Sequence, residues 1–202
     1  MTRDEESGLI KRVLNGDVNA FEPLVLEHRK KVYNLALKML GNNEDASDAS
    51  QEAFLKAFAS LGGFRGECKF SVWLYRLTSN ICTDIIRSRK ESMISLDAPE
   101  EHDRPRVPEI PDMRFSPETE LEKKEIRDAV RRGLERLSPD YRRILLLREI
   151  GGMSYEEIGN SLGLEAGTVK SRIFRARKQL CGFLAETGNI PPCYPSEKAS
   201  EV

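Results

Sequence analysis

The stretch from Gly167 to Leu180, GTVKSRIFRARKQL, collects five lysines and arginines and no acidic residue, although the whole 202-residue chain has a formal net charge of −1. A cluster of cations at this density favours binding to a polyanion. Lysine pairs with phosphates, arginine can bind a guanine edge, and an apolar ring can contact a thymine methyl group. Phosphate attraction alone would not require the phenylalanine of this stretch, Phe174. These residue types therefore predict contact with the bases of DNA as well as with its backbone.

A helical wheel at about 100° per residue separates this stretch into two faces. One face is apolar and is expected to pack on the rest of its domain: Val169, Ile173, Ala176 and Leu180. The opposite face and its flanks carry the residues that we predict to contact the DNA major groove: Lys170, Ser171, Arg172, Phe174, Arg175 and Lys178. An ordinary solvated helix face is the alternative, but it explains neither the exposed ring nor the missing acids.

A shorter helix is predicted immediately before this one. Ser154 to Glu157, SYEE, has the pattern of a capping box, and Gly163 is expected to end the helix. The DNA-contacting helix then begins near Ala166, with Glu165 as a weaker N-cap than Ser or Asp. Two helices joined by so short a turn form a helix-turn-helix, whose second helix can enter the major groove.

Phe64 to Lys90, FRGECKFSVWLYRLTSNICTDIIRSRK, suggests a different nucleic-acid chemistry, because aromatic residues alternate with cations near its start. A wheel sets four polar residues opposite an apolar face, with Trp73 beside them: Arg76, Asn80, Thr83 and Arg87. Cations that follow a phosphate backbone and rings that stack on bases are typical of single-strand binders, at about 1–3 kcal/mol per stacked base. Core packing of the rings is the alternative, which we favour for Phe70 and leave open for Trp73.

Asp45 to Phe58, DASDASQEAFLKAF, is a further predicted helix, with its acids gathered in the first turns as the helix dipole favours. Four of its residues can share one polar face: Asp48, Gln51, Glu52 and Lys56. The large apolar residues Phe54, Leu55 and Phe58 are expected to turn toward the core. On these residues alone, a solvated surface face is the simpler interpretation.

The remaining composition excludes several classes of protein. No uncharged apolar run approaches the roughly 18 residues of a membrane span, and the charged first residues do not resemble a signal peptide. We therefore expect a cytoplasmic protein without direct membrane insertion. The four cysteines form no CxxC pair and lie far in sequence from the two histidines, which argues against a zinc site and a disulfide framework. Without a glycine-rich phosphate loop, metal-ligand cluster or nucleophile motif, we expect neither an enzyme nor a cofactor.

Charge and proline content divide the chain. Residues 91–120 hold nine acidic residues against three basic ones, and five of the ten prolines. Such a segment cannot readily build a core, whereas both flanks have apolar residues at helical spacing. We predict an all-α fold of two small helical domains, 1–90 and 121–186, joined by a flexible linker at 91–120 and followed by a disordered tail at 187–202. A coil of the linker's length averages roughly 30 Å end to end, so both domains could touch one elongated partner.

In this order and spacing, the motifs resemble the sigma-70 family of RNA polymerase sigma factors. The likeness is to the small extracytoplasmic-function (ECF, group 4) type, and most of all to its sigma-E branch. It covers about residues 9–184 and rests on DASDASQEAFLKAFASL, FRGECKFSVWLYRLTSNICTDIIR, LSPDYRRILLLREIGGMSYEEIG and GTVKSRIFRAR. It implies that the first domain is sigma region 2 and the second is region 4. The chain departs from the family at Ala49-Ser50, where a larger apolar pair is usual, and in its longer tail.

The resemblance also implies partners and roles. Region 2 would dock on the clamp helices of the RNA polymerase β′ subunit through its acidic helix: Asp48, Gln51, Glu52 and Lys56. It would melt the −10 promoter element and hold the single strand, with a flipped base near Phe64 and Asn80, through seven residues: Phe64, Arg65, Trp73, Arg76, Asn80, Thr83 and Arg87. Region 4 would read the −35 element and bind the β flap. The free protein would be a monomer regulated by an anti-sigma factor, which is often membrane-bound.

A stand-alone helix-turn-helix regulator is the alternative function. It would leave the aromatic-cation segment and the acidic helix without a role, and it would usually need a dimer that matches a palindromic site. The near-neutral charge favours a polymerase subunit, because a protein that binds promoters alone normally carries excess positive charge. Promoter-directed initiation of transcription is therefore the function that the sequence predicts.

Overall fold

The computed structural model describes residues 1–95 and 117–187, and within these ranges every regular element is helical. The α-helices are α1 (Arg3–Leu14), α2 (Glu22–Leu40), α3 (Asn43–Ala59), α4 (Phe70–Ser95), α5 (Pro117–Arg136), α6 (Pro139–Glu149), α7 (Tyr155–Leu162) and α8 (Ala166–Glu186). Two short 3-10 turns, η1 (Val18–Phe21) and η2 (Leu61–Gly63), lie between the first four helices. The all-α prediction is confirmed. Residues 96–116 of the predicted linker, and the predicted tail from residue 188, lie outside the described residues.

Local sequence signals set most of the helix ends. The Thr2 side chain caps α1 together with Glu5, and Asn42 caps α3 by accepting from the backbone N–H of Asp45. Ser138 caps α6, whose first residue is Pro139, the position at which proline's fixed φ suits a helix. Gly41 ends α2 with a φ of 81°, a left-handed conformation that costs glycine little.

A row of alanines lets the helices of the amino-terminal domain approach closely. Helices α2, α3 and α4 pack against one another, and the inward stripe of α3 carries small side chains that are fully buried: Ala46, Ala49, Ala53 and Ala57. Ser50 joins this stripe and donates its hydroxyl to the Ala46 carbonyl at 2.5 Å. The Ala49-Ser50 pair, at which this chain departs from the sigma-70 pattern, therefore fits the close packing of α3.

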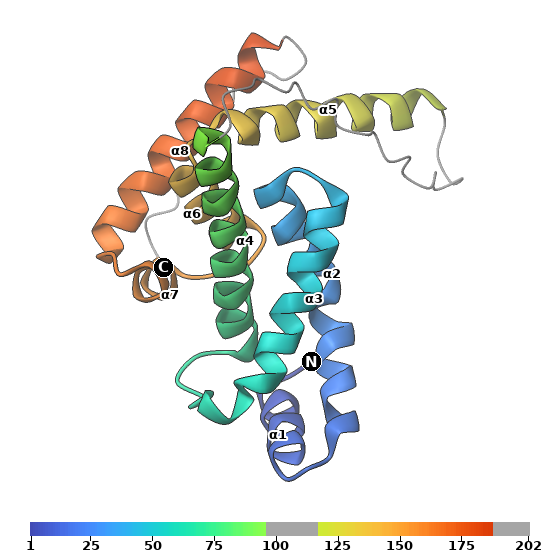
Figure 1. Ribbon diagram of the computed structural model, residues 1–202. Helices are drawn as coiled ribbons and strands as arrows, with labels where there is room; N and C mark the ends of the chain where they lie inside the picture. The colour runs from blue at the N-terminus through green and yellow to red at the C-terminus, as the bar shows by residue number, and fades with distance from the viewer. Residues whose placement is uncertain (96–116, 188–202) are drawn as a thin grey trace.

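The carboxy-terminal domain contains α5, α6, α7 and α8, and α6 reaches across to the other domain. Figure 1 shows α4 between the α2–α3 pair and the helices α6 and α8, and α6 contacts both α2 and α4. One cluster of buried side chains runs through both domains, from Leu35 in α2 to Leu147 in α6. In this structure the two domains are packed together.

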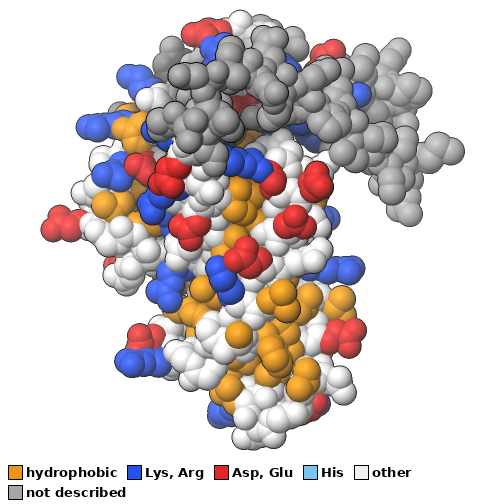
Figure 2. Space-filling view, in the orientation of Figure 1, with side chains coloured by type: hydrophobic (Ala, Val, Ile, Leu, Met, Phe, Trp, Pro, Cys, Tyr) orange, Lys and Arg blue, Asp and Glu red, His pale blue; other side chains and the backbone are white. Residues whose placement is uncertain are grey.

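The amino-terminal domain leaves part of its apolar surface uncovered. Figure 2 shows apolar side chains gathered near the end of the molecule where α1, η1 and α3 meet. Leu55 is 70% exposed, and Val18 and Phe58 are also exposed. Contiguous exposed apolar side chains of this kind often mark an interaction site.

Candidate nucleic-acid interface

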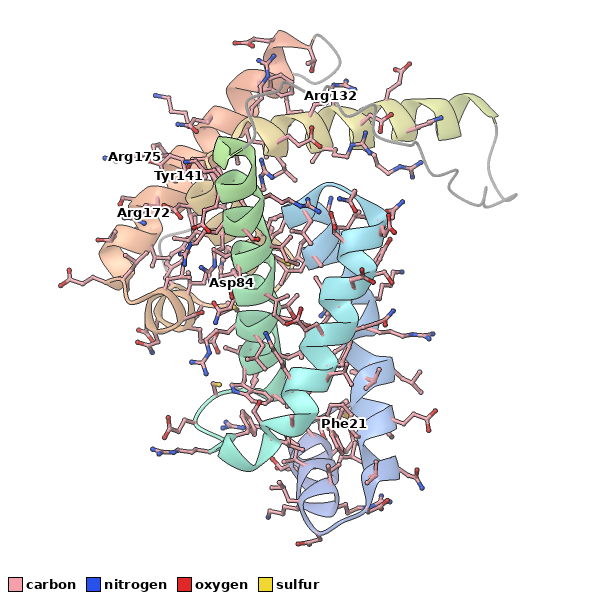
Figure 3. The ribbon with its side chains drawn as sticks, in the orientation of Figure 1. Phe21, Asp84, Arg132, Tyr141, Arg172 and Arg175 are labelled. Atoms are coloured by element: carbon pink, nitrogen blue, oxygen red, sulfur yellow. The ribbon has the colours of Figure 1, made fainter. Side chains whose placement is uncertain are left out.

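Helix α8 has the two faces that the sequence predicts. The packing face is confirmed: Val169, Ile173 and Ala176 are buried, and Leu180 is half-buried. On the other side Phe174 is 48% exposed. Most of the predicted DNA-contacting cations around it are exposed as well, and Arg172 is half-buried. Figure 3 shows Arg172 and Arg175 on the outer side of α8, away from the rest of the protein.

Two polar side chains of α8, Arg177 and Ser171, are hydrogen-bonded within the protein. Arg177 donates from Nε and Nη2 to one carboxylate oxygen of Glu149, at 3.1 and 2.5 Å, and so fastens α8 to α6. Ser171 donates its hydroxyl to the Thr168 carbonyl at 2.9 Å. Ser171 is exposed, and its hydroxyl oxygen can still accept from a donor on DNA.

The turn before α8 is fixed by close backbone contacts. Ser154 and Glu157 form the predicted capping box, with bonds of 2.7 and 3.1 Å between each side chain and the other's backbone N–H. Gly163 ends α7 with a φ of 66°, as predicted. A Cβ on Gly159 would lie 2.5 Å from the Leu164 carbonyl oxygen, so glycine is needed there for α7 and the turn to meet. Glu165 makes no side-chain cap bond to α8.

The aromatic residues at the start of α4 form a packed cluster. The Phe64 ring lies 5.2 Å from that of Trp73 and 6.0 Å from that of Phe70, between centroids. Phe70 is buried, as favoured from the sequence, and Trp73 is only 8% exposed. Phe64 is half-buried. Trp73 therefore supports Phe64 in this conformation and presents no free face for stacking on a base.

The polar residues predicted to bind a single strand lie along the more accessible side of α4 or just before it. Arg65, Asn80 and Arg87 are exposed, and Arg76 and Thr83 are half-buried. The Thr83 hydroxyl donates to the Ser79 carbonyl at 2.7 Å. Asn80 is not free, because its side-chain oxygen accepts from Arg143 of α6. The structure thus brings together the α4 residues and attaches Asn80 to the other domain.

The polar face predicted on α3 is at the surface, and Asp48, Gln51, Glu52 and Lys56 are all exposed. Glu52 pairs with Lys56 at 2.6 Å, one helical turn away, and Gln51 donates to the Ser47 hydroxyl at 3.3 Å. An open groove of about 570 Å³ adjoins Gln51. It is lined by Val18, Phe21, Glu22, Val25, Gln51, Phe54, Leu55 and Phe58, and we call it the α3 groove.

The α3 groove contradicts the prediction that Leu55 and Phe58 turn toward the core. Leu55 and Phe58 do not turn toward the core: Leu55 is 70% and Phe58 39% exposed, and the Phe58 ring packs on Phe21 at 5.2 Å. The alanine stripe fills the interior instead. The spacings of three and four residues between the alanines carry this information in the sequence, whereas the size of an apolar side chain alone does not show which face of α3 is buried.

Comparison with known proteins identifies both domains. The model for sigma-70 region 2 matches residues 24–92, and that for sigma-70 region 4 matches residues 127–180. The RNA polymerase sigma-H factor of Pseudomonas aeruginosa is 35% identical over 182 residues, which cover 89% of this chain and 94% of that protein. The chain belongs to the sigma-70 family. The ECF RNA polymerase sigma-E factor of Escherichia coli is 36% identical over 174 residues, covering 85% of this chain and 90% of that one.

A solved structure agrees with this assignment. CnrH in complex with the cytosolic domain of CnrY superposes with a TM-score of 0.65 at 25% identity, covering 90% of this chain and 98% of that chain. The expected ECF type is confirmed by the relatives. As an ECF sigma factor, the chain serves promoter recognition by RNA polymerase, with α2–α4 in region 2 and α5–α8 in region 4.

The thiols of this sigma factor that the structure describes as free are shielded. Cys82 is fully buried, and burial raises the pKa of its thiol to about 12. Cys68 is half-buried, and burial raises the pKa of that thiol as well. Among the described residues no group of three or more His, Cys, Asp and Glu side chains could hold a metal ion. None of the helices in the described ranges is long and apolar enough to cross a membrane.

Proposed function

We propose that this sigma factor reads the −35 element with the exposed face of α8. The observation that carries the proposal is Phe174, a ring 48% exposed on a helix face that has cations around it and no acid. Lys170 and Lys178 would bind phosphates, and Arg175 would bind a guanine edge. Ser171 and Arg172 complete the face. Arg177 is left out of it because Glu149 already holds its guanidinium group.

The −10 element would be held by region 2. We assign contact with the melted strand to the accessible polar residues of α4 and of the loop before it: Arg65, Arg76, Asn80, Thr83 and Arg87. Phe64 would bound the pocket for a flipped base. Trp73 would act through Phe64, since the two rings are in contact. No hydrolysis is required, because binding to unstacked bases offsets the cost of opening the duplex, and we propose a non-catalytic role.

Core polymerase would bind α3. Asp48 and Glu52 give this surface negative charge, and Leu55 and Phe58 in the α3 groove supply apolar area. A helix that carries both basic and apolar side chains matches such a surface. We propose the clamp helices of the β′ subunit as that partner, and the β flap as the partner of region 4.

We propose in addition that an anti-sigma factor controls the protein. CnrH, at 25% identity, has been solved with the cytosolic domain of CnrY. A regulator that covered the α3 groove would block polymerase from the same apolar surface. The protein would work in the cytoplasm as a monomer until polymerase or the regulator binds it.

Transcription with purified core polymerase tests the proposed function. The chain is mixed with core enzyme and genomic fragments; we expect it to co-elute with the core and to give run-off transcripts that neither component gives alone. A chain that binds specific DNA as a dimer and does not co-elute with the core would instead be a stand-alone regulator.

A further inference from the structure

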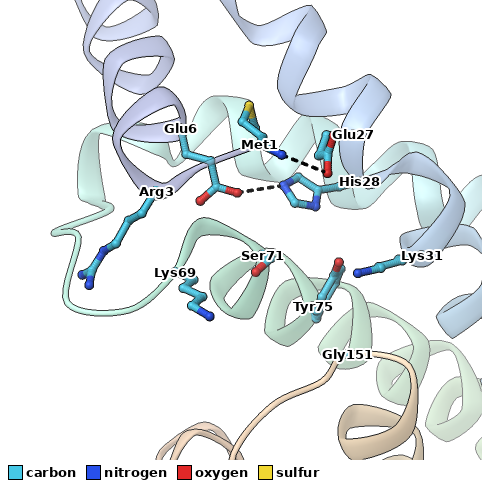
Figure 4. A pocket seen from close by; sticks show the side chains of 10 residues that line it. All are labelled: Met1, Arg3, Glu6, Glu27, His28, Lys31, Lys69, Ser71, Tyr75 and Gly151. Atoms are coloured by element: carbon cyan, nitrogen blue, oxygen red, sulfur yellow. Dashed lines mark hydrogen bonds and ion pairs between the residues drawn. The ribbon is translucent and has the colours of Figure 1, made fainter.

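A cavity of about 390 Å³ lies between α1, α2 and the start of α4, on a side of the protein that the proposed function does not use (Figure 4). Of the described residues that line it, all but Gly151 belong to the amino-terminal domain. Ser71 and Tyr75 line it from α4, and on the helical wheel they fall about 140–180° from Asn80. The cavity is thus separate from the face that we assign to the −10 element. Its volume lies in the range of small-molecule sites, about 300–1,000 Å³.

The hydroxyl of Tyr75 is a buried donor that faces this cavity. Only 2% of the residue is exposed, and Figure 4 shows its phenol oxygen pointing into the cavity. Within residues 1–95 and 117–187, no group forms a hydrogen bond with this oxygen. Burial raises the pKa of Tyr75 to about 12, so the hydroxyl keeps its proton and can donate. A buried donor without an acceptor is costly, and a ligand that accepts from Tyr75 would remove this cost.

Three cationic side chains line the cavity, each from a different segment: Arg3 of α1, Lys31 of α2 and Lys69 of the loop before α4. In the part of the chain that the structure describes, none of the three forms an ion pair. Arg3 donates to the Gly66 carbonyl at 3.3 Å, which holds its guanidinium group beside the loop. Cations without carboxylate partners beside a hydroxyl donor favour an anion, and a phosphate group can accept several charge-assisted bonds at once.

Two carboxylates line the same cavity, and each is engaged through one oxygen. Glu6 Oε1 lies 3.3 Å from His28 Nε2, and Glu27 Oε1 lies 3.7 Å from the amino group of Met1. Burial lowers the pKa of His28, so at neutral pH its ring donates to Glu6 as an uncharged group. Among the described residues the second oxygen of each carboxylate has no hydrogen-bond partner. These oxygens can accept from hydroxyl groups, so the cavity offers acceptors as well as cations.

We propose that this cavity binds a small phosphorylated sugar. The phosphate group accepts from the Tyr75 hydroxyl and pairs with Lys31 and Lys69. The sugar hydroxyls donate to the second oxygens of Glu6 and Glu27. A bare anion would leave these carboxylates facing like charge, and an uncharged sugar would leave the cations without a partner. Both halves of the ligand are therefore needed, and the site does not rest on the proposed reading of promoters.

Calorimetric titration of the full-length chain tests the class of ligand. The probe is glucose 6-phosphate, with inorganic phosphate and glucose as the arms that keep only one half of it. We expect saturable binding of one glucose 6-phosphate per chain, tighter than that of inorganic phosphate, and no binding of glucose. Absence of binding by glucose 6-phosphate at millimolar concentration would overturn the site. Equal affinity for glucose 6-phosphate and inorganic phosphate would overturn its assignment to a sugar.

Tyr75→Phe separates a built site from general attraction of anions, because it removes one hydroxyl and keeps the buried ring. Affinity for glucose 6-phosphate should fall about tenfold or more, since hydrogen bonds to charged groups are among the strong ones. The unfolding free energy of this variant should not fall, because the hydroxyl has no partner among the described residues.

Lys69→Ala should weaken binding of glucose 6-phosphate as well. Its matched control is Lys38→Ala, which removes another exposed lysine of the amino-terminal domain that does not line the cavity. An equal loss in the two lysine variants, with wild-type affinity in Tyr75→Phe, would reduce the binding to general attraction and overturn the proposal.

The DNA backbone is the other source of phosphate groups, and competition distinguishes it. A single-stranded −10 segment from a promoter found in the run-off assay is added to the complex with glucose 6-phosphate. We expect both to bind together, because the cavity and Asn80 lie on different sides of α4. Displacement of glucose 6-phosphate by the DNA would assign the cavity to the promoter strand and overturn the proposal. Promoter-directed run-off by Tyr75→Phe should match the wild type, so failure of the sugar-phosphate site leaves the proposed function standing.

Discussion

Leu55 offers a direct test of polymerase docking on the α3 groove, because it is large, apolar and mostly exposed in the free protein. Leu55→Ala removes about three carbon groups, each worth about 0.8 kcal/mol when fully buried. Since 70% of Leu55 is exposed, about 1.7 kcal/mol remains to be gained in a complex, which corresponds to a roughly 16-fold weaker Kd. The loss of folding stability should not exceed about 0.7 kcal/mol, because 70% of Leu55 is exposed and alanine is at least as good a helix former as leucine.

The assay is equilibrium competition for core polymerase against labelled wild-type protein. Leu14→Ala is the matched control: Leu14 is 51% exposed on α1 and does not line the α3 groove. Urea unfolding should show losses of stability of no more than about 1.2 kcal/mol for Leu14→Ala and about 0.7 kcal/mol for Leu55→Ala, in proportion to the buried part of each side chain. If Leu55→Ala binds core polymerase as tightly as the wild type does, docking at the α3 groove is refuted. If Leu14→Ala loses as much affinity for core polymerase as Leu55→Ala does, the effect is not specific to the α3 groove.

Arg175→Ala should cost about 1–3 kcal/mol in promoter recognition if Arg175 holds a guanine edge, with Arg132→Ala as the control; unchanged transcription from −35-dependent promoters would reject that role. Asn80→Ala should impair promoter opening more than closed-complex binding, and a normal permanganate footprint of the bubble would contradict this. Burial lowers the pKa of His28 below 6.5 despite Glu6, so the unfolded chain takes up a proton first as pH falls. The unfolding free energy should therefore fall as the pH drops through and below 6.5, and an equal fall in His28→Gln would show that other groups cause it.

Features encoded over a few residues could be predicted from the sequence. The division of α8 into a packing face and an exposed face follows from helical period alone, and the ends of α7 follow from Ser154 and Gly163. These signals are local because capping bonds and wheel positions involve residues within one or two turns.

Features that depend on contacts between a helix and segments distant from it in the sequence could not be predicted in the same way. Trp73 lies at the edge of the wheel's polar side, and its burial is decided by Phe64, which the preceding loop brings onto it. Arg143 and Asn80 are 63 residues apart in sequence, and no periodic pattern links them. The prediction for Leu55 is wrong because the spacing of the alanines, and not the size of the apolar side chains, decides which face of α3 is buried.

The alanine row of α3 places core packing on one face of the helix and leaves the other face for binding a partner, two tasks that usually compete on one helix. Stability resides on the alanine side, where any larger side chain would force α3 away from α2 and α4. The most exposed side chains of the outer face, Leu55 among them, contribute little to folding and can vary without endangering it. A helix built in this way can be given new partner specificity by changing its outer residues alone. It is therefore a suitable starting point for engineering a sigma factor and polymerase that recognise only each other.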